Sequence, residues 1–132
     1  LNRARALVLE ADVVVVAACA LSREGKDRRT LSLAWEADAL IHAVAQLRPT
    51  VVLLHSPGAV LTPWRNQTAA IANLFYGGEQ TGWAWAAVLF GDHAPTGRLP
   101  IEFPATEADA IRPGPAAEDG EFYPVPYTEG ML

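Results

Sequence analysis

The chain has 132 residues, of which 51% are apolar and 19% charged, with a net charge of −5 at pH 7. This length fits one domain, and the apolar content excludes a disordered chain. A single Cys excludes an internal disulfide, and ten Gly and ten Pro without a period exclude a collagen-like chain. No basic patch is visible in the sequence, so we expect no nucleic-acid partner.

Helical and strand patterns alternate along the first half of the chain. Residues 3–11 fit the last turns of a helix, and residues 13–18 form the apolar run of a strand buried on both faces. Apolar residues at helical spacing predict a helix over residues 36–47, which Pro49 ends. Residues 50–54 predict a second buried strand.

The second half begins in the same way and then loses its regular pattern. Residues 69–75 predict a third strand, residues 80–90 a helix with Gly91 at its end, and residues 99–103 a short edge strand. Seven of the ten prolines follow residue 94, which predicts a long, loop-rich C-terminal third.

We therefore expect an α/β fold with an open, mostly parallel sheet and helices on both faces, that is, a three-layer sandwich. Ligands of such sheets bind at the carboxyl ends of the strands. The longest uncharged apolar stretch, residues 51–64, is too short and too interrupted by Pro and Gly to span a membrane.

A dense charged segment, residues 22–29, follows the first predicted strand and has six charges in eight residues. One interpretation is a solvated surface loop. The other is a ligand loop, because Gly25 beside Glu24 would let the backbone approach a ligand. A general acid must hold its proton, and Arg23 and Lys26 beside Glu24 favour the ionised carboxylate instead. Composition therefore leaves both interpretations open.

Other chemistries find little support in the sequence. His55 and Ser56 are adjacent, so in an extended chain they point in opposite directions, and no G-x-S-x-G pattern is present. Three scattered His and one Cys lack the spacing of a metal site. No nucleotide-binding glycine motif follows the first strand. We expect neither a metal nor a cofactor.

Several separated stretches, taken in order, resemble the carboxy-terminal α/β sandwich domain of the glycoside hydrolase family 3 β-glucosidases. The similarity covers roughly residues 6–132, and the order and spacing of the stretches make it specific. The matching stretches are Ala11 to Val16, the pattern Ser22-x-Glu24-Gly25-x-Asp27-Arg28-x-x-Leu31-x-Leu33, Val51 to Ser56, Gly58-x-Val60-Leu61, Gly78-x-x-x-Gly82, Val88 to Pro100 and Tyr123 to Gly130.

The resemblance implies hydrolysis of β-linked glucosides or oligosaccharides with retention of configuration, which uses a carboxylate nucleophile and a carboxyl acid/base. In that family the nucleophile is an Asp of an amino-terminal barrel domain, and the acid/base is in many members a Glu on the loop that residues 22–29 match. Glu24 would then be the acid/base. Asp27 and Arg28 would form a loop-holding ion pair or border the sugar site. The resemblance favours an extracellular, periplasmic or vacuolar location.

The chain departs from the family pattern at several places, among them a short approach at Lys26-Asp27. Gly77-Gly78-Glu79 replaces Pro-Gly-Gln, Trp83 and Trp85 replace smaller or aliphatic residues, and Ala34-Trp35 replaces a turn with Pro. We expect residues 1–104 to be an incomplete sandwich domain and residues 105–132 its loop-rich extension. Without the barrel domain, the segment is expected to be inactive.

Two alternatives remain at the level of the sequence. The first is a non-catalytic relative that serves as a structural or protein-interaction module, in which Trp83 and Trp85 could form an interface. Because Trp83 and Trp85 are two residues apart on one helix, at least one of them should be exposed or packed on another domain. The second alternative is a flavodoxin-like small-ligand module, favoured by topology alone.

Overall fold

The computed structural model describes residues 2–110 and has an α/β fold built on a three-stranded parallel sheet. The helices are α1 (Asn2–Glu10), α2 (Ala37–Ala45) and α3 (Thr81–Leu89). The strands are β1 (Val14–Cys19), β2 (Thr50–His55) and β3 (Ala70–Leu74). Each of these elements overlaps a segment predicted from the sequence. The Tyr123–Gly130 stretch and most of the predicted extension, residues 105–132, lie outside the described residues.

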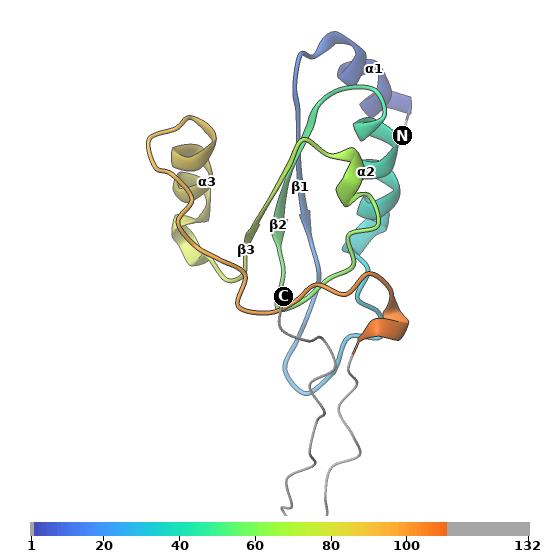
Figure 1. Cartoon of the computed structure of the whole chain (residues 1–132), viewed down its shortest axis with the longest axis vertical. Coiled ribbons are helices and arrows are strands. Elements are labelled where there is room, and N and C mark those ends of the chain that lie inside the picture. Colours follow the sequence, from blue (N-terminus) through green and yellow to red (C-terminus); the bar gives the residue numbers. More distant parts are fainter. Residues whose placement is uncertain (1, 111–132) are drawn as a thin grey trace, which may run out of the picture.

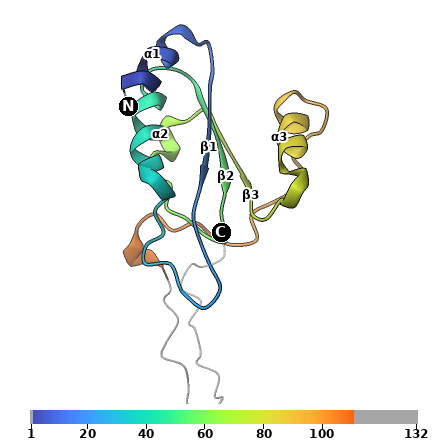
Figure 2. The ribbon, with the colours of Figure 1, turned by 180° about the vertical axis from the view of Figure 1, so that it is seen from behind.

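The sheet has the order β1-β2-β3, so β2 is central and every strand runs in the same direction. Val16 pairs with Val52, and Val52 pairs with Ile71, which brings the carboxyl ends of the three strands to one edge. α1 and α2 cover one face of the sheet and α3 lies on the other (Figures 1 and 2). This three-layer arrangement is the predicted one.

The apolar core lies between the sheet and α1 and α2. Val16, Val52 and Leu54 contribute from the strands, and Ile41 and Val44 from α2. Trp64 is fully buried in the same core, and its indole Nε1 donates a hydrogen bond to Asp38 Oδ1 at 2.8 Å.

Among residues 2–110, no helix is both long enough and apolar enough to cross a bilayer.

Two expectations about strands are wrong. β1 is buried on one face only, since Val15 is 49% exposed while Val16 and Ala18 are buried. Residues 99–103 form no strand, because Pro100 has no backbone N–H to donate and Leu99 and Ile101 remain exposed.

Candidate functional site at the carboxyl edge of the sheet

Three loops meet at the carboxyl edge of the sheet, because parallel strands all end there. The charged loop, residues 22–27, follows β1, residues 56–58 follow β2, and Tyr76 follows β3. The structure thus brings segments that are far apart in the sequence to the same edge.

The charged loop is a tight turn with Glu24 at its tip. Arg23 and Lys26 form an isolated antiparallel bridge, and Gly25 between them has φ +70°. This left-handed backbone favours glycine, which has no Cβ to clash with the following carbonyl. Glu24 and Asp27 are both exposed. The turn therefore leaves Glu24 exposed at its tip, beyond the end of β1.

A hollow of about 570 Å³ lies at this turn, within the range of about 300–1,000 Å³ typical of small-molecule sites. It is lined by Ser22, Arg23, Glu24, Gly25, Lys26, Asp27 and Tyr76. The Tyr76 hydroxyl and Ser22 Oγ share a hydrogen bond of 3.3 Å that joins the loops after β3 and β1. The sequence did not identify Tyr76 as a site residue. The feature of the sequence that could have identified Tyr76 is its position, an aromatic residue directly after the third predicted strand.

Arg28 does not line the hollow, and its side chain connects two loops. Its Nη2 donates to the Ala59 carbonyl at 2.8 Å, while its buried Nη1 has no partner among the described residues. Asp27 and Arg28 form no ion pair with each other, so the expected loop-holding pair is absent. The loop is instead held by the bond from Arg28 to the segment after β2.

The hollow can support proton transfer. A carboxyl group that faces an open hollow can give a proton to a bound ether oxygen or take one from a bound water. Glu24 and Asp27 provide two such groups, and Arg23 and Lys26 provide donors for sugar hydroxyls. Within residues 2–110, no three His, Cys, Asp or Glu side chains cluster closely enough to hold a metal ion.

His55 and Ser56 are engaged in bonds that position structural elements. Trp85 Nε1 of α3 donates to His55 Nε2 at 2.7 Å, with the two rings edge to face. Ser56 is 1% exposed, and its Oγ donates to Asn73 Oδ1 at 3.0 Å. Neither arrangement activates a nucleophile, in agreement with the sequence argument against a serine hydrolase.

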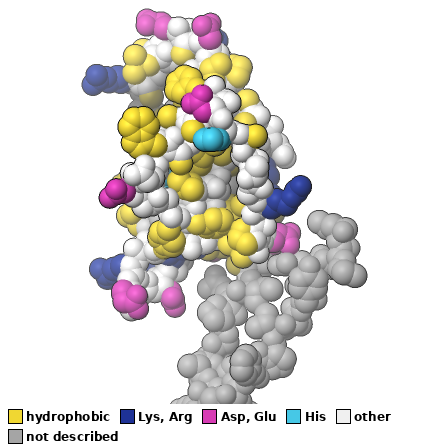
Figure 3. All heavy atoms as spheres, turned by 90° about the vertical axis from the view of Figure 1, so that its left-hand side faces the viewer, with side chains coloured by type: hydrophobic (Ala, Val, Ile, Leu, Met, Phe, Trp, Pro, Cys, Tyr) yellow, Lys and Arg dark blue, Asp and Glu magenta, His cyan; other side chains and the backbone are white. Residues whose placement is uncertain are grey.

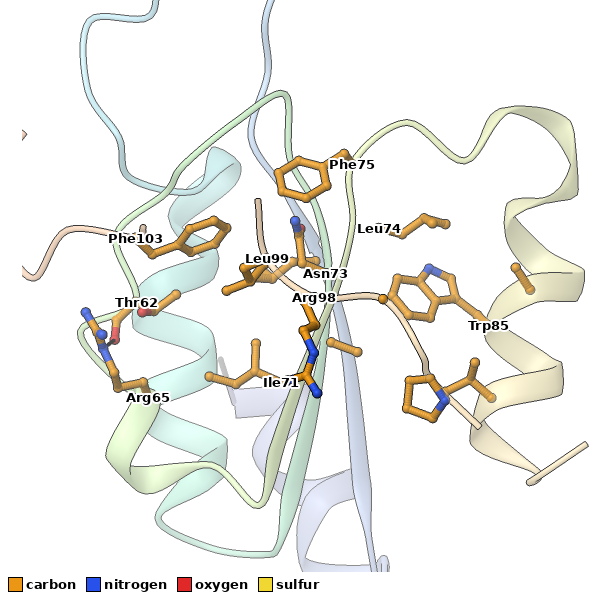
Figure 4. A pocket seen from close by; sticks show the side chains of 16 residues that line it. Thr62, Arg65, Ile71, Asn73, Leu74, Phe75, Trp85, Arg98, Leu99 and Phe103 are labelled. Carbon is orange, nitrogen blue, oxygen red and sulfur yellow. Dashed lines mark hydrogen bonds between the residues drawn. The ribbon is translucent and has the colours of Figure 1, made fainter. Parts of the chain in front are cut away.

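A second cavity, of about 620 Å³, lies along the free edge of β3. Figure 4 shows Thr62 and Phe103 on one side of it and Trp85 of α3 on the other. Most of its lining is aliphatic or aromatic, including Ile71 and Leu99. Because sugar hydroxyls require polar partners, the smaller hollow beside Glu24 is the better candidate for a carbohydrate.

The model of the glycosyl hydrolase family 3 C-terminal domain matches residues 1–132, that is, the whole chain. The chain belongs to this family. A β-glucosidase from Rhizobium radiobacter is 39% identical over 112 residues, which are 83% of this chain and 14% of that protein.

Solved family 3 structures share the fold. The β-glucosidase DesR from Streptomyces venezuelae, in complex with D-glucose, is 39% identical with a TM-score of 0.75, over 80% of this chain and 14% of that one. A β-glucosidase from Kluyveromyces marxianus in complex with glucose is 32% identical with a TM-score of 0.76, over 82% and 14% of the two chains. The chain thus spans about one seventh of the length of these family 3 relatives.

Proposed function

We propose that this domain supplies the acid/base side of the active site of a retaining, β-glucosidase-like glycoside hydrolase. The observation that carries the proposal is the position of Glu24. It lies at the tip of a glycine turn and in a hollow at the carboxyl edge of the sheet, in a domain of family 3. The names of the relatives indicate β-linked glucosides as substrates.

In the first step, protonated Glu24 gives its proton to the glycosidic oxygen as the bond from that oxygen to the anomeric carbon breaks. The leaving alcohol departs, and a carboxylate nucleophile from an amino-terminal barrel domain bonds to the anomeric carbon. In the second step, ionised Glu24 takes a proton from water, whose oxygen displaces the carboxylate. Glu24 then holds its proton again, and the sugar is released with its configuration retained.

The proposed chemistry needs a second domain. A glycoside is cleaved with retention when two carboxyl groups lie about 5–5.5 Å apart across the bond. Glu24 is exposed in this chain, and a barrel domain closing over it would remove water from around its carboxyl group. We therefore expect the isolated segment to be inactive.

Asp27 and Arg28 have different roles in this proposal. Asp27 lines the hollow, where its carboxylate can accept hydrogen bonds from sugar hydroxyls. Arg28 borders the site and acts through the loop, which its hydrogen bond to Ala59 connects to the segment after β2.

A non-catalytic, interaction role is the second candidate, and the α3 side of the molecule favours it. Trp83 is 77% exposed and Phe90 85% exposed, and Trp85 is half-buried, as the spacing of the two tryptophans predicted. Figure 3 shows hydrophobic side chains gathered over this face. An apolar surface of this kind suits packing against another domain or protein.

Activity of the whole protein distinguishes the two candidates. The full-length protein should hydrolyse an aryl β-glucoside, and Glu24→Gln should lower kcat about 10²- to 10⁴-fold, the usual contribution of a general acid/base. Full activity of the Glu24→Gln protein would remove Glu24 from the chemistry. An inactive unaltered protein that still binds a partner through the α3 face would favour the interaction role.

A further inference from the structure

A histidine at the end of the central strand is bonded to helix α3. His55 is the last residue of β2, and its Nε2 accepts the indole N–H of Trp85 at 2.7 Å. Because an indole nitrogen donates and does not accept, His55 Nε2 must have a free lone pair in this arrangement. The bond therefore requires a neutral imidazole with its proton on Nδ1.

The two rings also meet in a way that a protonated imidazole would disturb. Their centroids are 5.6 Å apart and their planes are inclined by 73°, which is an edge-to-face arrangement. The N–H edge of Trp85 meets His55, and a cation is attracted by the face of an indole, whereas the edge carries partial positive charge. An imidazolium has an N–H at both nitrogens, so protonation of His55 would set donor against donor.

The attachment of α3 to the sheet depends on this contact. No residue of α3 is buried, and among residues 2–110 the bond to His55 is the one side-chain hydrogen bond from this helix to a strand. Ala84, Trp85 and Val88 of α3 also form one wall of the cavity of about 620 Å³ (Figure 4). Loss of the bond would thus loosen the helix and open that wall.

Few other titratable groups belong to the elements packed around His55. β3 and α3 have none, and β1 has the thiol of Cys19, the register partner of His55. The exposed charged or titratable groups at the two ends of α3 and along the cavity are Glu79, Asp92, His93 and Arg98. None of them hydrogen-bonds to His55 in the described part of the chain. A protonated His93 beyond the C-terminus of α3 would favour the helix, an effect opposite in sign to that of His55.

We propose that His55 is a pH-sensitive switch, which holds α3 on the sheet when the imidazole is neutral and releases the helix when the imidazole is protonated. Histidine is the side chain whose charge ordinarily changes between pH 5 and pH 8. Because proton binding and the bond to Trp85 exclude each other, a fall in pH through that range favours the released helix. This inference does not depend on the assignment of Glu24.

Hydrogen–deuterium exchange of the full-length protein at pH 8 and pH 5 tests the switch. Protection factors, which correct for the intrinsic pH dependence of exchange, are compared between peptides from α3 and from β2. Protection of α3 should fall about three- to tenfold at pH 5, as expected for the loss of one hydrogen bond, while protection of β2 stays unchanged.

His55→Gln is the decisive variant, because its Oε1 can accept from Trp85 and gains no proton in this pH range. It should keep α3 protected at both pH values. His93→Gln is the matched control, since it removes another histidine close to α3 and should leave the pH response in place. Trp85→Phe removes the donor, so α3 should be weakly protected at both pH values.

Two results would overturn the switch. One is equal protection of α3 at pH 8 and pH 5 in the unaltered protein, as expected if another segment of the full-length protein covers the helix. The other is a His55→Gln protein that responds to pH as the unaltered protein does. Neither result bears on the activity attributed to Glu24.

Discussion

Arg28 is the side chain that fastens the charged loop to the rest of the sheet edge. Its bond to Ala59 spans 31 positions of the sequence and joins the loop after β1 to the segment after β2. We expect the position of Glu24 at the tip of this loop to depend on this bond together with the bond from Ser22 to Tyr76.

Arg28→Ala should therefore lower kcat of the full-length protein more than it raises KM, and should cost about 1 kcal/mol of stability through the lost hydrogen bond. Steady-state kinetics on an aryl β-glucoside measure the effect. Arg29→Ala is the control, because Arg29 is exposed and makes no hydrogen bond to the described part of the chain. Equal effects of the two variants would contradict the role given to Arg28.

Asp38 stabilises the start of α2 and the core together. Its Oδ2 accepts from the Leu33 backbone N–H at 2.9 Å, and its Oδ1 accepts from the indole of the fully buried Trp64. Asp38→Ala leaves a buried indole N–H without an acceptor and removes a negative charge from the first turn of a helix.

We expect Asp38→Ala to lower the free energy of unfolding by about 2–3 kcal/mol. Urea unfolding followed by tryptophan fluorescence measures the change. Asp12→Ala removes an exposed carboxylate that has no such partners among residues 2–110 and should stay within about 0.5 kcal/mol. A loss below 1 kcal/mol for Asp38→Ala would show that the indole finds another acceptor.

At the scale of single residues, the sequence predicted Glu24, Asp27 and Arg28 as site candidates but not the contacts between the loops that carry them, such as the bond from Arg28 to Ala59. The motif from Ser22 to Arg28 is local, so it could be identified directly in the sequence. The bond between Ser22 and Tyr76 spans 54 positions and depends on the folding of the sheet. Tyr76 could be assigned to the site only after β1 and β3 were placed.

At the scale of elements, α3 is a helix with little burial against the sheet. No residue of α3 is buried, although its sequence is apolar on every side, and its polar link to the sheet is the bond from Trp85 to His55. An element with few buried contacts opens at a lower free-energy cost than a central strand does.

Backbone amides of α3 in this chain should therefore exchange with deuterium faster than those of β2, which lies in the middle of the sheet. Trp85→Phe removes the indole donor and should speed exchange in α3 further, with no change in β2. Hydrogen–deuterium exchange read by mass spectrometry measures both elements at once. Equal exchange rates in α3 and β2 would contradict this account of α3.

The positions of the strands could be predicted because runs of β-branched residues are a strong signal for strands. The layers that pack on each face of a strand could not be predicted. The Val13–Ala18 run indicates a strand covered on both faces, whereas β1 is covered by α1 and α2 only. Coverage depends on which other layers pack on the sheet. The segment over residues 99–103 has apolar residues but no neighbouring strand in the described part of the chain, so its pattern was misleading.

At the scale of the whole molecule, the chain is one domain of a longer architecture in its relatives. It spans 14% of the Rhizobium and Streptomyces β-glucosidases. The proposed function requires a nucleophile from another domain. The exposed face of β1 and the apolar α3 side are surfaces on which further layers can pack. The division of the domain into residues 1–104 and an extension over residues 105–132 stays a prediction.

The central claim, that Glu24 is the acid/base, predicts a specific pattern of rescue. Glu24→Ala in the full-length protein should slow release of the glycosyl intermediate about 10²- to 10⁴-fold, because no base activates water. Azide needs no base, so it should restore turnover of an activated aryl β-glucoside and give β-glucosyl azide as the product. Asp27→Ala under the same conditions should show no azide rescue. Recovery with azide in Glu24→Ala confirms the assignment, and full activity without azide, or a loss that azide does not relieve, contradicts it.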